Sequence, residues 1–163
     1  DVSALPNLPN LTGLDLSSCD SLQNADGLAN LPKLTSLVLY GCDSLQNVDG
    51  LANLTNLTSL DLESCSSLQN VDVLANLPNL TSLSLYSVDS LQNVDGLVNL
   101  PNLTSLSLYS CDSNKLGVLA NLPNLTSLNL KYSDEVQPKP SIGKMTTREE
   151  VAAYQEEIRK SMK

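Results

Sequence analysis

Residues 34–42 of the chain read LTSLVLYGC, with leucine at the first, fourth and sixth positions and cysteine at the ninth. Leucines at 37 and 39 alternate with outward residues, which is the period of a β-strand with one buried face. The chain is then expected to turn at the Cys-Asp-Ser segment and to return through VDGLANL at residues 48–54. There, Asp49 is predicted to cap a short helical turn.

This pattern recurs along the chain with a period of 23 residues. The anchor leucines are Leu11, Leu34, Leu57, Leu80, Leu103 and Leu125, and the last step is 22 residues because residues 111–115 carry a deletion. The capping aspartate recurs as Asp26, Asp49, Asp72 and Asp95. One unit cannot bury its own leucines, whereas stacked units share a continuous core. Repetition therefore predicts a solenoid.

The repeated L-x-x-L-x-L-x-x-C unit resembles the leucine-rich repeats over residues 1–133. It is most similar to the internalin type and the phosphatase-regulator type. Its cysteine is similar to that of the cysteine-containing repeats of some trypanosomatid and bacterial proteins. The resemblance implies an α/β solenoid in which about six parallel strands form a concave sheet, with short 3-10 turns on the convex side.

Both ends depart from the repeat. Residues 1–5 align with the middle of a unit, so the solenoid is expected to begin without an N-terminal cap. Residues 134–146 contain two prolines and are predicted to form a linker. Residues 147–163 are predicted to form an amphipathic helix that opens with a capping box and ends near Ser161. Its apolar stripe comprises Val151, Tyr154, Ile158 and Met162, and the first three are candidate residues for docking the helix onto the solenoid or onto a partner.

Composition excludes several functions. The chain has 35 leucines and no His, Phe or Trp, and the lack of His removes the commonest general base and zinc ligand. Asp61 and Glu63 lie about 6.5–7 Å apart on one strand face, but no pocket is expected to raise one pKa. No catalytic residue or cofactor is therefore predicted. The net charge of −9 argues against nucleic-acid partners, and no apolar run approaches the roughly 18 residues needed for membrane insertion.

Three further polar columns follow the repeat. The cysteine column is predicted to be a ladder of buried, reduced thiols, because Val88 replaces cysteine in one copy; it comprises Cys19, Cys42, Cys65 and Cys111. Aspartates could bind calcium, but turn and capping roles account for them better, so no metal site is predicted. Asn-Leu-Thr sequons recur at Asn10, Asn53, Asn56, Asn79, Asn102 and Asn124, and glycosylation depends on the source of the protein.

The outward positions of the strands escape this uniformity. The central positions are Asp15, Val38, Asp61, Ser84, Ser107 and Asn129. Two places on, the chain carries Ser17, Tyr40, Glu63, Tyr86, Tyr109 and Lys131, with Tyr132 following. Drift of unconstrained surface would explain such variation. However, tyrosines flanked by acids are typical of a protein-binding face, because Tyr combines contact area with a polar tip.

These observations predict non-catalytic protein recognition through the concave face by a monomer, with Tyr40, Tyr86 and Tyr109 as anchors. The partner is expected to have a basic or mixed surface. The resemblance adds a bacterial secreted effector in which this chain is the targeting part. The alternative is an assembly element that oligomerises through its N-terminal edge or its C-terminal helix. Unpaired cysteines favour an intracellular location, or delivery into a host cell.

Overall fold

Strands alternate with short helical turns in the computed structural model, which describes residues 2, 8–92, 94–108, 116–130, 138–140 and 143–163. The strands are β1 (Gly13–Asp15), β2 (Ser36–Val38), β3 (Ser59–Asp61), β4 (Ser82–Leu85), β5 (Ser105–Leu108), β6 (Ser127–Asn129) and β7 (Lys144–Met145). The 3-10 turns are η1 (Asp26–Asn30), η2 (Asp49–Asn53), η3 (Asp72–Asn76) and η4 (Asp95–Asn99), and the α-helices are α1 (Leu116–Leu119) and α2 (Arg148–Ser161).

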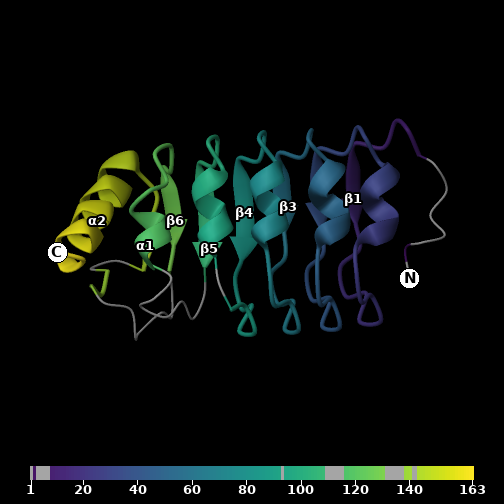
Figure 1. Cartoon of the computed structure of the whole chain (residues 1–163), viewed down its shortest axis with the longest axis horizontal. Helices are drawn as coiled ribbons and strands as arrows, with labels where there is room; N and C mark the ends of the chain where they lie inside the picture. The colour runs from purple at the N-terminus through teal and green to yellow at the C-terminus, as the bar shows by residue number, and fades with distance from the viewer. Residues whose placement is uncertain (1, 3–7, 93, 109–115, 131–137, 141–142) are drawn as a thin grey trace.

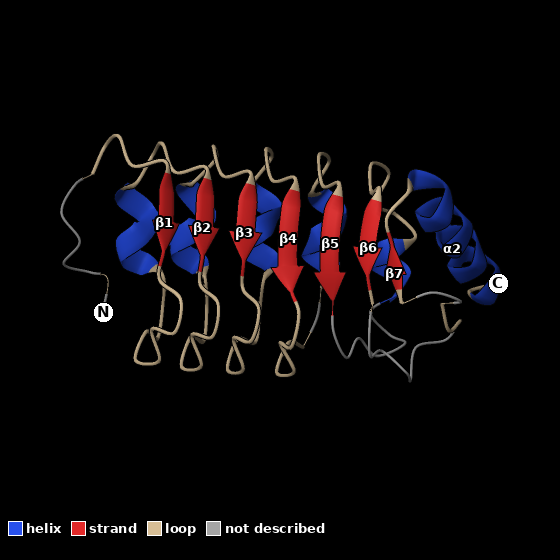
Figure 2. Ribbon diagram, turned by 180° about the vertical axis from the view of Figure 1, so that it is seen from behind, coloured by secondary structure: helices blue, strands red, loops and turns tan. Residues whose placement is uncertain are grey.

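The strands form one sheet in the order β1-β2-β3-β4-β5-β6-β7. From β1 to β6 all neighbours are parallel, and equivalent positions of successive repeats pair, as in Leu37 with Leu60. The helical turns cover one face of this sheet (Figure 1), and the strands face the viewer from the other side (Figure 2). The predicted parallel solenoid with 3-10 turns is thus confirmed.

Two elements differ from the sequence-based expectation. β7 lies within residues 134–146, which were predicted to be linker, and pairs antiparallel with β6 through Leu128 and Met145. A two-residue strand has no periodicity of its own, so only the neighbouring edge of the sheet reveals it. In the shortened repeat, the return segment forms the α-helix α1 instead of a 3-10 turn. It lacks the Asp-Gly pair with which η1, η2 and η4 begin.

Leucine columns build the core. Inward leucines such as Leu37, Leu60 and Leu83 are each 1% exposed, and those on the return segments, such as Leu51, are fully buried. Each fully buried leucine contributes roughly 1.5–3 kcal/mol relative to exposure. A core without Phe or Trp is thereby possible, because every repeat places the same side chain against the same neighbour.

The helical turns begin differently from the prediction. Asp26, Asp49, Asp72 and Asp95 were predicted to be N-caps, but each is the first residue of its turn, and no cap side-chain hydrogen bond is made. The asparagine two residues earlier serves instead: Asn24 Oδ1 accepts from the Asp26 amide at 3.2 Å, and Asn70 Oδ1 accepts from the Asp72 amide at 2.6 Å. Asn side chains suit this role because they bond their own backbone two residues on.

The predicted capping box of α2 is present. Thr147 accepts from the Glu150 amide, while the Glu150 carboxylate accepts from the amides of Thr146 and Thr147 at 2.9 and 3.2 Å. These bonds hold the pKa of the Glu150 carboxyl below its usual value. The box fixes where α2 starts, directly after β7.

Candidate functional site

The open side of the sheet carries the candidate site, and we call it the strand face. It consists of three columns of outward side chains. The first column is Gly13, Ser36, Ser59, Ser82, Ser105 and Ser127; the central column is Asp15, Val38, Asp61, Ser84, Ser107 and Asn129; the outer column includes Ser17, Tyr40, Glu63 and Tyr86. Tyr109, Lys131 and Tyr132 were also predicted for this face but lie outside the described residues.

The outer column stays in register although it lies beyond the strands. The Ser18 amide donates to the Tyr40 carbonyl at 2.7 Å, the Gly41 amide to the Glu63 carbonyl at 2.8 Å, and the Ser64 amide to the Tyr86 carbonyl at 2.8 Å. These bonds continue the parallel ladder, so Tyr40, Glu63 and Tyr86 sit side by side, about 4.8 Å apart from strand to strand.

A left-handed residue follows each outer-column position. Ser18, Gly41, Ser64 and Ser87 have φ values of 57°, 66°, 60° and 57°. This conformation is ordinary for glycine and uncommon for serine, and it turns the chain away from the sheet. Sequence reasoning missed this feature, whose signal is the glycine at 41 in a column that carries serine at 18, 64 and 87.

Exposure differs along the face. Tyr40 is 44% exposed, and Asp15 is exposed as well. Ser17 is also exposed. The other described residues of the central and outer columns are half-buried, namely Val38, Asp61, Glu63, Ser84, Tyr86, Ser107 and Asn129. The inward neighbours are buried throughout β2 to β6. Period-two alternation therefore brings the predicted residues to one surface, with the aromatic ones at the edge where the strands end.

Carboxylates give this surface its charge. Asp15 accepts hydrogen bonds from the hydroxyl and amide of Ser17, which lower the pKa of its carboxyl. Asp61 accepts from the Glu63 amide at 2.9 Å. Burial, and secondarily the Asp61 charge, raises the pKa of Glu63. The ion pairs found among the described residues are Arg159–Glu156 and Lys160–Glu156, both within α2, so neither Asp61 nor Glu63 has a described cationic partner.

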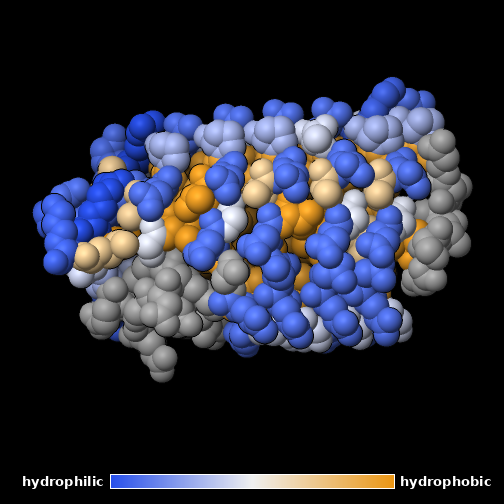
Figure 3. Space-filling view, in the orientation of Figure 1, coloured by the Kyte–Doolittle hydropathy of each residue, from blue (hydrophilic) through white to orange (hydrophobic). Residues whose placement is uncertain are grey.

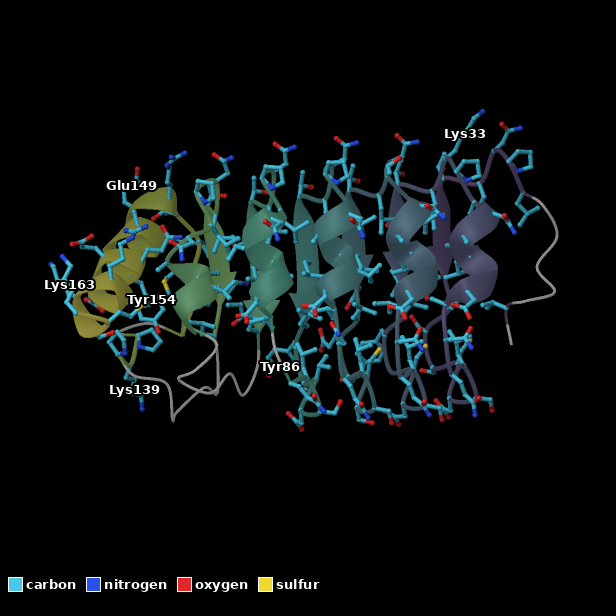
Figure 4. All side chains as sticks on the ribbon, in the orientation of Figure 1. Lys33, Tyr86, Lys139, Glu149, Tyr154 and Lys163 are labelled. Atoms are coloured by element: carbon cyan, nitrogen blue, oxygen red, sulfur yellow. The ribbon has the colours of Figure 1, made fainter. Side chains whose placement is uncertain are left out.

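An open groove of about 790 Å³ runs along the opposite edge, where the strands begin. It is lined by Thr12, Lys33, Thr35, Asn56, Thr58, Asn79, Thr81, Asn102 and Thr104. Its donors hold neighbouring repeats together: Thr35 Oγ1 donates to the Thr12 carbonyl at 2.9 Å, and Asn56 Nδ2 to the Pro32 carbonyl at 2.8 Å. Figure 4 shows Lys33 at this edge and Tyr86 at the other. The lining contains no carboxylate or thiol, so it offers no acid–base or nucleophilic group of those kinds.

The cysteines are structural where they are described. Cys19, Cys42 and Cys65 are free thiols; Cys42 Sγ donates to the Leu16 carbonyl at 3.3 Å and Cys65 Sγ to the Leu39 carbonyl at 3.2 Å. Burial raises the pKa of the Cys65 thiol to about 12. Cys111 lies outside the described residues. Among the described residues, no three or more Cys, Asp or Glu side chains are grouped so that they could hold a metal ion.

The helix α2 packs on the last repeat. Val151, Tyr154 and Ile158 are 0%, 4% and 1% exposed, so these predicted docking residues lie inside the chain's own core. Met162, predicted to belong to the same stripe, is 64% exposed. Gln155, which was not part of the predicted stripe, is buried instead of Met162.

Polar groups of α2 satisfy the end of α1. Gln155 Nε2 donates to the carbonyls of Leu119 and Leu122 at 2.7 and 2.9 Å. Arg159 donates to the Ala120 carbonyl. Carbonyls at a helix end lack intrahelical donors, and the cation suits the negative end of the helix dipole. Sequence reasoning missed Gln155 because a polar residue on an amphipathic helix normally faces water.

The side of the helical turns looks different. Hydrophilic residues line both long edges, and hydrophobic residues show between the turns (Figure 3). Val98 is the large apolar residue most exposed within these turns, at 40%. None of the helices in the described part of the chain has the length and apolar character needed to cross a membrane.

Comparisons with known proteins agree with this architecture. The sequence model of the family described as "Zer-1-like, Leucine-rich repeats" matches residues 2–70 and 48–132. The solved structure of internalin C2 from Listeria monocytogenes is 31% identical with a TM-score of 0.57, and the match covers 80% of this chain and 65% of internalin C2. Internalin F from the same organism is 28% identical with a TM-score of 0.32, over 64% of this chain and 43% of internalin F. No curated protein matches the chain. The chain therefore belongs to the leucine-rich repeat family, with internalin-like repeats.

Proposed function

We propose that this chain is a non-catalytic protein-recognition module that binds its partner through the strand face. The observation that carries the proposal is the outer column, in which Tyr40, Glu63 and Tyr86 stand in register on a sheet face that no helical turn covers. Tyrosine is enriched at protein interfaces because its ring adds apolar area and its hydroxyl adds a hydrogen bond. The rigid sheet fixes these side chains before binding, which lowers the entropic cost of association.

The charge of the face selects the partner's surface. Asp15, Asp61 and Glu63 have no described cationic partner, and the whole chain carries a net charge of −9. A basic or mixed partner surface complements this face and speeds association at low salt. Increasing the salt concentration should therefore lower the association rate constant by a larger factor than it changes the dissociation rate constant.

The experiment compares three immobilised proteins: the wild type, a Tyr40→Ala/Tyr86→Ala variant, and a Val98→Ser control altered on the helical side. Far-UV circular dichroism first establishes that all three are folded. Proteins retained from lysates and secretions are then quantified by mass spectrometry. Partners retained by the wild type and by Val98→Ser, but lost from the tyrosine variant, support recognition by the strand face. Equal retention by all three proteins refutes it.

The parent protein and its destination form a wider proposal. The chain spans 65% of internalin C2, and we propose that it is the targeting part of a larger secreted bacterial protein delivered into or onto a host cell. Fractionating the producing bacteria and their host cells with an antibody to this chain tests the destination. Recovery only from the bacterial interior contradicts the delivery.

Assembly is the competing function, and the structure weakens one route to it. A dimer formed through α2 would need exposed apolar residues, whereas Val151, Tyr154 and Ile158 are buried within the chain. Light scattering coupled to size exclusion should therefore give a monomer. A dimer that persists in the tyrosine variant would favour assembly over recognition.

A further inference from the structure

Glu63 lies between two tyrosines of the neighbouring repeats. The backbone bonds from Gly41 to Glu63 and from Ser64 to Tyr86, both 2.8 Å, fix the order Tyr40, Glu63, Tyr86 across three adjacent strands. Because parallel strands are about 4.8 Å apart, the stem of each tyrosine stands one strand spacing from Glu63. The register thus places one acidic residue between two aromatic ones; we call these three residues the trough, with Glu63 as its floor and the two tyrosines as its walls.

The floor carries negative charge without a described counter-charge. Glu63 and Asp61 are both half-buried on the same face, and Asp61 accepts the Glu63 amide at 2.9 Å. Burial and, secondarily, the Asp61 charge raise the pKa of Glu63, because both disfavour its ionised form. A cation bound above Glu63 relieves this penalty, since opposite charge favours the ionised carboxylate.

The walls suit a cation as well. A cation is attracted to an aromatic face within about 6 Å of the ring centroid. One placed above Glu63 lies about one strand spacing, roughly 4.8 Å, from each tyrosine column. Among protein cations, the guanidinium is planar, stacks on aromatic faces and donates two parallel hydrogen bonds to a carboxylate, whereas an ammonium is a compact, strongly hydrated charge.

We propose that Tyr40, Glu63 and Tyr86 form a subsite for an arginine side chain of the partner protein. This inference rests on the proposed function, because it names the chemistry by which the strand face recognises its partner. Asp61 contributes the second negative charge beside the guanidinium.

The probe is N-acetyl-arginine amide, titrated into the full chain and followed by NMR of the aromatic protons. The chain lacks Phe, Trp and His, so its aromatic spectrum contains only the five tyrosine rings. Single Tyr40→Leu and Tyr86→Leu variants assign the two rings of the trough. The probe should shift both rings and leave Tyr154 unchanged, because Tyr154 is a buried residue of α2. The uncharged citrulline analogue of the probe should shift neither.

Charge variants then locate the site. Glu63→Gln keeps the shape of the side chain and should weaken the probe about tenfold, the loss expected when a charge-assisted bond becomes a neutral one. Asp49→Asn removes the same charge from the helical side, at an exposed residue of η2, and should leave the affinity unchanged. If both variants bind the probe equally more weakly than the wild type, the effect is due to the net charge of the chain and not to this site, and the proposal is overturned.

Two other outcomes also overturn the subsite. Binding of N-acetyl-lysine amide as tightly as the arginine probe would make the trough a general cation site. The absence of ring shifts at any probe concentration would remove the site altogether. Neither result touches the tyrosine-dependent capture of partners, so failure of the arginine subsite and failure of strand-face recognition are separable.

Discussion

Gly50 should tolerate a side chain poorly. It is the second residue of η2 and packs against the neighbouring η1 turn. A Cβ at this position would lie 2.3 Å from the Ala25 carbonyl oxygen and 2.6 Å from the Asp26 Cα. Because these are backbone atoms, Gly50→Ala can be accommodated only if the two turns move apart.

The magnitude follows from two opposing effects. Forcing an extra methyl group into a packed contact costs roughly 1–3 kcal/mol, whereas replacing glycine by alanine restricts the unfolded chain and returns about 0.4–1 kcal/mol. Gly50→Ala should therefore lower the free energy of unfolding by about 1–2 kcal/mol. Val73, which occupies the equivalent position of η3, shows that a side chain fits there when the whole interface is built around it.

Two other glycines provide a graded control. At Gly96 an added Cβ would lie 3.0 Å from the Asp72 Cα, its nearest neighbour, and at Gly13 it would meet nothing within 4 Å. The loss of stability should therefore rank Gly50→Ala above Gly96→Ala above Gly13→Ala, with the last within about 0.5 kcal/mol of the wild type. Urea unfolding followed by far-UV circular dichroism measures all three. If Gly50→Ala proves no less stable than Gly13→Ala, the close packing of the turns is wrong.

Three further predictions concern stability. The stability of Cys65→Val should lie within about 1.5 kcal/mol of the wild type at pH 7, because Val88 fills the same column. Burial raises the pKa of the Cys65 thiol to about 12 in the folded protein against an ordinary 9.0, so the wild type should lose stability more steeply than this variant as pH rises from 9 to 12. Urea unfolding of both proteins at pH 8 and 10.5 measures this difference. Gln155→Leu should lower the free energy of unfolding by about 1–3 kcal/mol, because the carbonyls of Leu119 and Leu122 each lose a donor. Thermal unfolding measures this loss, and Glu157→Gln, at an exposed residue of the same helix, should leave stability unchanged. Thr147→Ala should lower the free energy of unfolding by about 1 kcal/mol through loss of the N-cap. The pKa of Glu150 is lowered in the folded protein, so its stabilising contribution should be lost as pH falls below about 4.5. If Glu150→Gln loses stability at low pH in the same way as the wild type, this reasoning is contradicted.

The repeat made most of the fold predictable. Leucine spacing identified the strands and the buried columns, because each leucine meets the same neighbours in every unit, so one local pattern is reinforced six times along the chain. The capping box of α2 was predictable for the opposite reason, since its bonds join residues only three apart. Both kinds of feature are encoded locally.

The missed features depend on partners far away in the sequence. β7 exists because Met145 meets Leu128 at the sheet edge, and Gln155 is buried where its amide donates to the carbonyls of Leu119 and Leu122. Asn24 was missed for a chemical reason, as both Asn and Asp are good caps and the pattern alone favoured Asp26. For the candidate site, sequence alternation predicted which side chains share the face, while the half-burial of Glu63 required the structure.

The repeat also accounts for which positions are free to vary. An inward leucine is surrounded by the units on both sides, so substitution there removes contacts from three repeats at once. An outer-column residue lies outside the leucine core, so the fold leaves its chemistry free. The proposed trough would use that freedom while depending on the stack, because Tyr40, Glu63 and Tyr86 come from three different units. No single repeat supplies all three, and their spacing is set by the backbone bonds that continue the parallel ladder beyond the strands. A leucine-rich core of closely similar units is thus what holds these three variable side chains next to one another, as the proposed site requires.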